Sequence, residues 1–342
     1  MPNCNLVNLL QRTISGCFVL LIMASPVNAG QDCRVDTSRV NANGFSPQQQ
    51  ALWQDLVHLS SAAMQGRKSG TEGAQLAREY IARRYQESGL VPLPQKQGQD
   101  NSEETASWFH TFTPPGLFTR TEGANVIGQI KGQHKPDKFL VLSAHYDHLG
   151  KQGRKIHFGA NDNASGVAAL IYIAQQLSQT GSHHSILFLA TDYEEAGLYG
   201  AAAFVQQGIP EHADILMNIN MDMLAQPGRN WTLYVAGTRW FPEIKPAVER
   251  VLGNAPICAE TGMDRVSRSY DRSYRIDWRK ASDHWEFAQQ DIAWLYLGVK
   301  DFKYYHTIYD TPDKLSRPFY TGVVETAWQL VVAVDSHFSH PK

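Results

Sequence analysis

Seven acidic and histidine side chains could bind metal ions, because each stands at the end of an apolar segment or in a loop after one: His145, Asp147, Asp162, Glu194, Glu195, Asp222 and His306. Taken singly, a histidine or carboxylate of this kind is usually structural or solvated. Carboxylates that converge on one rim of a sheet repel one another, and a cation is the simplest way to hold them together. Imidazole and carboxylate ligands without a thiolate suit zinc, which cobalt or manganese can replace.

The segments that would position these side chains alternate between strands and helices. Continuous apolar runs predict strands over 139–144, 186–190, 215–221 and 292–299. Helical patterns cover 45–65, 71–88, 166–179, 198–207 and 321–338. Strands that are apolar on both faces and separated by helices predict a three-layer α/β/α fold, with a mixed, mainly parallel central sheet covered by helices on both faces. Ligands of such sheets bind beyond the carboxyl ends of the strands.

Other parts of the chain limit the possible partners. The polar segment 94–106 is expected to be an exposed loop. Hydrophobic residues make up 43% of the 342 residues and charged residues 19%, as in ordinary soluble globular proteins. The formal net charge is -2, so we expect neither nucleic acid nor an acidic membrane surface as a partner.

The first 29 residues are predicted to be a signal peptide. Their apolar run, 17–24, is shorter than the roughly 18 residues that a spanning helix needs, and Val27-Asn28-Ala29 has the small-residue character of a cleavage site. We therefore expect a secreted or periplasmic protein with no stable membrane anchor after signal removal. An N-terminal membrane anchor is the alternative. Cys33 and Cys258 would remain and could pair in an oxidising compartment.

The order of these motifs resembles that of the co-catalytic zinc exopeptidases of peptidase clan MH, which include bacterial leucyl aminopeptidases and glutamate carboxypeptidase. The resemblance covers roughly residues 55–320 and is carried by the segments 64–67, 70–73, 89–92, 145–147, 159–166, 194–200, 220–223, 282–284, 306–307 and 310–314. It implies one zinc exopeptidase catalytic domain over 30–342, without a protease-associated insertion, and two zinc ions per chain.

The resemblance also implies a role for each charged residue. Two zinc-binding sets would share one aspartate: His145, Asp162 and Asp222 in one, and Asp162, Glu195 and His306 in the other. Glu194 would be the general base, and Asp147 would accept the second ring N–H of His145. A cis peptide bond is predicted between Asp162 and Asn163.

The implied reaction is zinc-dependent hydrolysis of a peptide bond at a peptide terminus, by a metal-bound hydroxide. We expect an aminopeptidase, because Glu194 and Asp222 could bind a free ammonium group. The alternatives are a glutaminyl-peptide cyclase that uses one zinc ion, a carboxypeptidase of the same family, and a non-enzymatic binding module. Arginines within 265–279 could form a carboxylate clamp or a solvated basic face. Substrate contacts are expected from Tyr270, Tyr274, Asp283 and His284.

Overall fold

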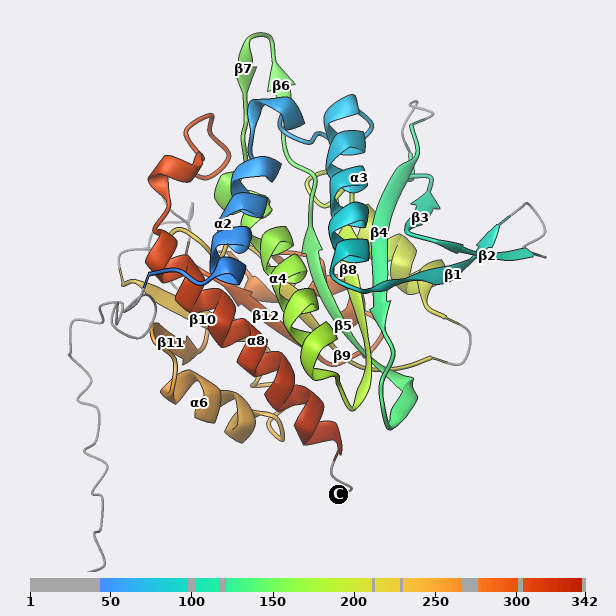
Figure 1. The fold of residues 1–342 in the computed structure, drawn as a ribbon, viewed down its shortest axis with the longest axis vertical. Coiled ribbons are helices and arrows are strands. Elements are labelled where there is room, and N and C mark those ends of the chain that lie inside the picture. Colours follow the sequence, from blue (N-terminus) through green and yellow to red (C-terminus); the bar gives the residue numbers. More distant parts are fainter. Residues whose placement is uncertain are drawn as a thin grey trace, which may run out of the picture. The chain divides into compact units, whose positions relative to one another are not determined.

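A mixed sheet of ten strands lies at the centre of the computed structural model (Figure 1). The structure describes residues 44–97, 103–116, 121–210, 213–227, 230–265, 276–300 and 304–339. The strands of this sheet are β1 (Val91–Gln97), β2 (Glu103–Ser107), β3 (Phe109–Phe112), β4 (Gly123–Ile130), β5 (Lys135–His145), β8 (His184–Thr191), β9 (Asp214–Met221), β10 (Thr232–Ala236), β11 (Cys258–Thr261) and β12 (Trp294–Gly298). Their order is β11-β10-β12-β9-β5-β8-β4-β1-β2, and β3 pairs with β4.

The four central strands run in the same direction. β5 pairs in parallel with both β8 and β9, and β12 pairs in parallel with β9. On either side of this group, β4 and β10 pair antiparallel to their inner neighbours. The carboxyl ends of β5, β8 and β9 therefore meet at one edge of the sheet, as expected for a mixed α/β sheet with a parallel centre.

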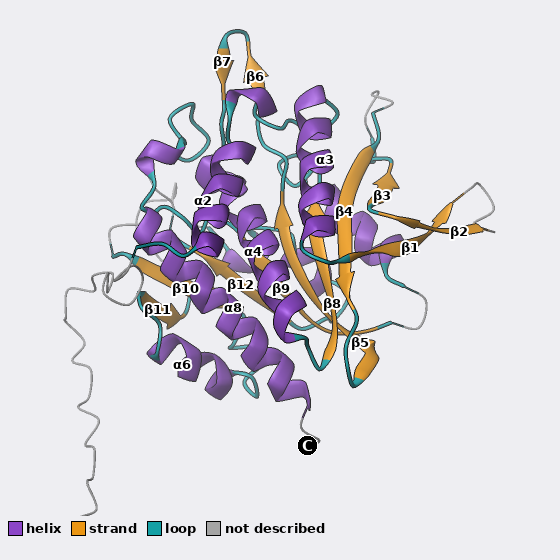
Figure 2. Cartoon of the chain, in the orientation of Figure 1, coloured by secondary structure: helices purple, strands orange, loops and turns teal. Residues whose placement is uncertain are grey.

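Helices cover both faces of the sheet (Figure 2). They are α2 (Pro47–Leu59), α3 (Glu72–Glu87), α4 (Ser165–Thr180), α5 (Tyr199–Ala203), α6 (Lys245–Gly253), α7 (His284–Ala288) and α8 (Arg317–Ser339). Along β5, Leu140 and Leu142 pack into the larger core, to which α2, α3, α4, α6 and α8 contribute. Phe139 and Val141 point to the opposite face and pack with Phe287 of α7. This alternation confirms the predicted three layers.

Local sequence signals explain where the first helices begin. Ser46 and Gln49 form a capping box at the start of α2, and Pro47 occupies the first turn. Thr71 is the residue before α3, as predicted, but its hydroxyl donates to the carbonyl of Lys68 instead of capping the helix. The predicted helix over 45–65 ends earlier, at Leu59, and a 3-10 turn follows over Ala62–Met64.

The predicted exposed loop over 94–106 is wrong. Strands β1 and β2 pair antiparallel there, with Leu93 opposite Ser107 and Gln97 opposite Glu103. Backbone hydrogen bonds at the end of a sheet need no apolar pattern in the side chains, so the polar sequence hid the strands. In Figure 1 this hairpin projects from the end of the sheet. A second, two-stranded hairpin joins β6 (Lys151–Gln152) to β7 (Lys155–Ile156).

The described residues all belong to one compact unit, which spans Cys33–Lys342. Within them, every helix is too short or too polar to cross a membrane. The predicted signal peptide over 1–29 lies outside the described residues. Cys258 is disulfide-bonded. Its partner also lies outside the described part of the chain, where Cys4, Cys17 and Cys33 stand.

Candidate metal centre

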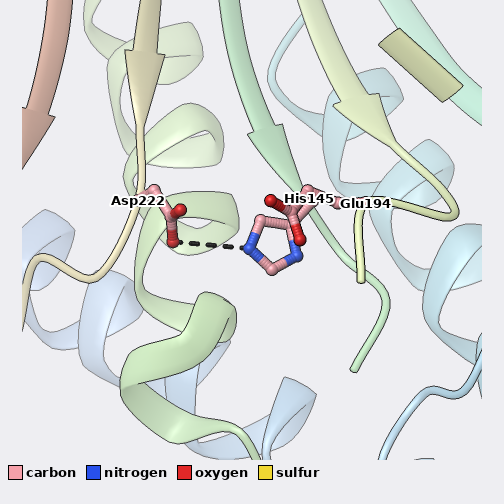
Figure 3. A group of neighbouring side chains, drawn as sticks. All are labelled: His145, Glu194 and Asp222. Carbon is pink, nitrogen blue, oxygen red and sulfur yellow. Dashed lines mark ion pairs between the residues drawn. The ribbon is translucent and has the colours of Figure 1, made fainter. Parts of the chain in front are cut away.

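Parallel strand ends bring the predicted metal ligands together. His145 is the last residue of β5, Asp222 follows β9 directly, and Glu194 and Glu195 lie in the loop after β8. Figure 3 shows His145, Glu194 and Asp222 at the ends of their strands, where their side chains approach one another. The alignment of strands in the sheet therefore supplies three of the segments that build the site.

A tight turn before α4 supplies Asp162. Residues Ala160–Ala164 form a turn in which Asp162 and Asn163 have non-helical backbone angles, and the peptide bond between these two residues is cis, as predicted. The Asn163 amide donates to the carbonyl of Met221 and accepts from the backbone N–H of Gly166. A Cβ atom at Gly166 would lie 2.4 Å from the Met221 carbonyl oxygen, so only glycine fits there. These contacts fix the turn against the end of β9.

Asp162 stands between two groups of ligands. Its Oδ1 lies 3.4 Å from His145 Nε2, which in turn lies 3.3 Å from Asp222 Oδ1. Its Oδ2 lies 3.1 Å from His306 Nε2, which lies 3.1 Å from Glu195 Oε2. Each oxygen of one carboxylate thus faces a separate pair formed by one histidine and one acid.

These residues fit two zinc ions. In a tetrahedral site with bonds of about 2.0–2.1 Å, neighbouring donor atoms lie roughly 3.3–3.4 Å apart, close to the four distances above. Asp162 Oδ2 and Asp222 Oδ1 are buried and have no hydrogen-bond partner among the described residues. A buried carboxylate oxygen without a donor is costly, and a cation beside it removes that cost.

Contrary to what the resemblance implied, the Asp147 carboxylate does not accept the hydrogen of His145 Nδ1. The nearest acceptor to His145 Nδ1 is the main-chain carbonyl oxygen of Asp147 at 3.2 Å, whereas the carboxylate Oδ1 of Asp147 lies 3.7 Å away. That carboxylate accepts hydrogen bonds from the backbone N–H groups of Glu194 and Glu195, and from the Ser69 hydroxyl. The Asp147 side chain therefore holds the loop after β8.

The acids of the site strongly affect one another. Burial raises the pKa of Glu194 well above its usual value; the nearby His145 opposes this shift, and the carboxylates of Asp222 and Asp283 add to it. Burial likewise raises the pKa of Asp222 and that of Asp283 to about 7. A cluster of this kind favours either protonation or bound cations.

A small cavity opens onto the ligands. Beside the charged residues, its described lining is mainly apolar and aromatic: Met223, Ile276, Trp278, Ala281, Tyr296, Val299 and Tyr305. Tyr305 is 40% exposed and stacks on the ring of His306, with 3.9 Å between ring centroids. The cavity thus joins the candidate metal centre to an apolar wall.

The residues predicted to contact substrate are placed differently. Asp283 and His284 are completely buried and do not line the cavity. The Thr191 hydroxyl donates to the Asp283 carboxylate, and His284 Nε2 donates to the carbonyl of Trp278 at 2.7 Å. The structure therefore gives both side chains structural partners and no access to a ligand in the cavity. Tyr270 and Tyr274 lie outside the described residues.

Three buried residues around the site were not assigned a role from the sequence. Arg67 donates to the carbonyls of Leu59, Tyr146, Phe158 and Gly159. These four carbonyls lie in three separate segments of the chain. The carboxylate of Asp310 accepts from the backbone N–H groups of Asn161 and Asp162. His148 lies beside Glu195. Each occurs near a recognised motif, but its partners lie far away in the sequence, so spacing alone gave no signal.

Fold and site together define an α/β protein with two candidate groups of metal ligands at one edge of its sheet. Residues 125–331, more than half of the chain, match the model of Peptidase family M28. The protein belongs to this family.

Individual relatives differ in the activity that their names describe. Aminopeptidase YwaD of Bacillus subtilis is 25% identical over 207 residues, which cover 58% of this chain and 42% of that protein. A glutamate carboxypeptidase 2 homolog of Caenorhabditis briggsae is 35% identical over 111 residues, which cover 29% of this chain and 13% of that protein. The chain spans only 12% to 42% of the length of the curated relatives compared.

Solved structures support the fold. A leucine aminopeptidase precursor from Bacteroides thetaiotaomicron superposes with a TM-score of 0.61 at 19% sequence identity, over 83% of this chain and 96% of that one. At this level of identity the likeness establishes a shared architecture and leaves the activity to be argued from the site.

Proposed function

We propose that the protein is a zinc-dependent exopeptidase that releases N-terminal residues from peptides. The observation that carries this proposal is the position of Asp162, whose two oxygens face two separate groups of ligands. A shared carboxylate of this kind suits a pair of ions that act on one substrate. Membership of a peptidase family makes peptide bonds the expected target.

Glu194 is the residue placed to move protons. Bound zinc supplies a nucleophile at neutral pH and polarises the scissile carbonyl group. Glu194 lines the cavity beside His145 and Asp222, and burial raises its pKa, which makes the carboxylate a better proton acceptor. It takes one proton from the attacking water and returns it to the departing amine, so the carboxyl and amine products are balanced.

The charge of the cavity supports the choice of the amino end. Glu194 and Asp222 line it, whereas its described lining contains no lysine or arginine. Such a surface suits the ammonium group of a free N-terminus and gives no partner to a C-terminal carboxylate. The apolar wall that includes Met223, Trp278 and Val299 suits a terminal residue with an apolar side chain.

A panel of chromogenic peptides tests this proposal. We expect cleavage of substrates with a free amine, with leucyl, methionyl and phenylalanyl derivatives faster than glutamyl or lysyl ones. A chelator should abolish the activity and added zinc should restore it. Cleavage of N-blocked peptides from the carboxyl end would overturn the choice of end, and activity that survives complete metal removal would overturn the metal-dependent reaction.

Metal content separates the proposal from its alternatives. A peptidase of this design should bind two zinc ions per chain, a glutaminyl-peptide cyclase one, and a binding module none. His145 and Asp222 complete a second set of ligands beside the one that includes His306, which favours two. Elemental analysis of the purified protein gives the count directly.

We also propose that the protein acts outside the cytoplasm after removal of residues 1–29. The N-terminal pattern of a short apolar run followed by small residues supports export. The disulfide bond of Cys258 supports an oxidising compartment. Intact-mass measurement of the natural protein should give a chain that begins at Gly30; a full-length chain in the membrane fraction would support the anchor instead.

A further inference from the structure

His148 is a buried histidine beside the proposed zinc ligands. It follows β5 by three residues, and its side chain is almost completely buried. Its Nδ1 lies 2.8 Å from Glu195 Oε1 and 3.7 Å from Asp162 Oδ2. The backbone N–H of His148 donates to the carbonyl of Arg67, which fixes the main chain at this point.

Two roles are chemically open to such a histidine: a metal ligand, or a hydrogen-bond donor to a ligand. The distances separate them. Between the proposed ligands, the His306–Asp162 and His306–Glu195 contacts are both 3.1 Å, near the roughly 3.3–3.4 Å between donors in a tetrahedral zinc site. The 2.8 Å between His148 Nδ1 and Glu195 Oε1 is a charge-assisted hydrogen-bond length instead.

The two oxygens of Glu195 have different partners. Oε2 faces His306, whereas Oε1 faces His148. An ionised carboxylate can only accept hydrogen bonds, so the Nδ1 atom of His148 must carry the hydrogen. The other ring nitrogen, Nε2, is buried without a hydrogen-bond partner among the described residues. The ring therefore acts on Glu195 and does not pass a proton to another described group.

We infer that His148 is a positioning residue that makes Glu195 a one-oxygen zinc ligand. The inference rests on the proposed two-zinc function. By binding Oε1, His148 turns only Oε2 toward the ion that His306 also faces. Without that hydrogen bond, Glu195 is free to present both oxygens to the same ion, which raises the number of ligand atoms and takes space from the substrate. His148 thus determines how many oxygens of Glu195 face the second zinc ion, without contacting the ion or the substrate itself.

A matched pair of variants tests the role of the donor. His148→Asn keeps an N–H group near the position of Nδ1, and His148→Leu has nearly the shape of asparagine without a donor. The metal-free proteins are titrated with Co²⁺, and visible absorption and calorimetry follow each ion. Equal thermal unfolding of the two metal-free variants shows that both fold. If the leucine variant does not fold, His148→Met, which also lacks an N–H donor, replaces it.

We expect His148→Asn to bind both cobalt ions as the wild type does. His148→Leu should bind the second ion 10- to 100-fold more weakly, the usual effect of removing a partner from a metal ligand. In this variant the visible absorption of Co²⁺ at the second site should also weaken. A carboxylate that binds through both oxygens raises the coordination number of the ion, and Co²⁺ with more ligands absorbs more weakly. Affinity for the first ion should stay unchanged in both variants.

Two results would overturn the inference. Equal affinity and an unchanged spectrum in His148→Leu would show that Glu195 does not need the donor. Equal loss of the second ion in His148→Asn and His148→Leu would show that His148 is itself a ligand. Failure of the proposed function looks different, because the wild type would then bind fewer than two ions before any variant is compared.

Discussion

Glu194 is the residue on which the proposed chemistry depends most directly. It lines the cavity, and its carboxylate lies within 4.8 Å of the ligand atoms of His145 and Asp222. The closer histidine–acid pairs of the site are His145 with Asp222 at 3.3 Å and His306 with Glu195 at 3.1 Å, so the neighbour Glu195 belongs to one of these pairs and Glu194 to neither. We therefore expect the two adjacent acids of this loop to have different roles, Glu194 as the base and Glu195 as a ligand.

The variant Glu194→Gln should therefore keep both metal ions and lose turnover. Glutamine has the shape of glutamate but cannot accept a proton at neutral pH, so we expect turnover to fall about 10²- to 10⁴-fold. Elemental analysis and steady-state kinetics on a leucyl substrate measure the two effects. Near-normal turnover would remove Glu194 from the base role, and loss of a metal ion would make it a ligand.

His284 gives a prediction for the pH dependence of stability. Burial lowers its pKa to about 4, below the usual value of about 6.5. Between these values the unfolded chain takes up a proton that the folded chain does not, so this residue reduces stability as the pH falls. His284→Phe keeps a ring beside Tyr296, with which His284 stacks, and cannot titrate.

Urea unfolding of the metal-free wild type and of His284→Phe measures this effect at pH 7 and pH 4. The stability of the variant relative to the wild type should improve by up to about 3 kcal/mol over that range. Other titrating groups contribute to both proteins and cancel in the difference. A difference that stays constant with pH would show that the pKa of His284 is the same in the folded and the unfolded chain.

The sequence indicated some residues of the candidate site more clearly than others. Asp162, Glu195 and Asp222 were predicted as ligands because each carries a charge where an apolar segment ends or a loop begins, and the structure brings them close to the two histidines. Asp310 lies within one of the recognised motifs and His148 directly after another, but neither was given a role, since a hydrogen bond to a distant segment leaves no mark in spacing. Asp283 and His284 were expected at the substrate, and their complete burial could not be read from their polar character.

At the scale of elements, the buried turn at Arg67 joins the segments that carry the site. Its guanidinium donates at 2.6 to 2.8 Å to carbonyls at the end of α2, after β5 and before the Asp162 turn. The side chain is completely buried, and burial lowers its pKa to about 10. One cation thus donates to four carbonyls in three separate segments, of which the Gly159 carbonyl also accepts from the backbone N–H of Ala164.

Replacing Arg67 should therefore destabilise the fold more than most single changes. Arg67→Met removes the side-chain donor of the carbonyls of Leu59, Tyr146 and Phe158, and we expect a loss of at least about 3 kcal/mol in the free energy of unfolding. Arg67→Lys keeps the charge but presents fewer donors in fixed directions, so its loss should be smaller. Denaturant unfolding measures both.

The control for this prediction is Arg83→Lys on the outer face of α3. Its side chain is 59% exposed and its ion pair with Glu87 is long, at 3.9 Å, so the change should stay within about 0.5 kcal/mol. If Arg67→Met were no worse than this control, the guanidinium would not hold the segments together.

The elements that the sequence predicted are those with one dominant pattern. β5, β8 and β9 are buried on both faces over most of their length, and such strands appear as continuous apolar runs. β4 was missed although it is mostly buried, because Gly128 and Asn125 interrupt its apolar residues. A Cβ at Gly128 would lie 2.7 Å from a Leu90 methyl carbon, so packing between separate elements dictates that glycine.

At the scale of the whole molecule, the charge is unevenly distributed. The formal net charge is only -2, yet the acids Asp162, Glu194, Glu195 and Asp222 converge at one edge of the sheet. Asp162 and Asp222 are at most 5% exposed, so water screens them poorly. Without cations, this edge holds more negative charge than the fold can easily tolerate.

Removal of the metal ions should therefore lower the melting temperature of the whole domain. Two ions, each present at 100 times its dissociation constant, stabilise a folded protein by about 5 kcal/mol together. For a domain of this size that corresponds to a fall in Tm of roughly 8 °C on chelation, reversed by zinc. Differential scanning calorimetry measures the change, and a Tm that does not respond to the chelator would contradict a two-ion site in the fold.

The variant Asp222→Asn makes this prediction specific to the proposed site. It removes one buried carboxylate, so the metal-free variant should melt at a higher temperature than the metal-free wild type, because less unpaired charge remains. It also removes a ligand beside His145, so zinc should raise its Tm by less. If Asp222→Asn instead lowered both melting temperatures equally, the acid would serve packing alone. The opposite signs of the two expected shifts distinguish a metal ligand from a structural aspartate.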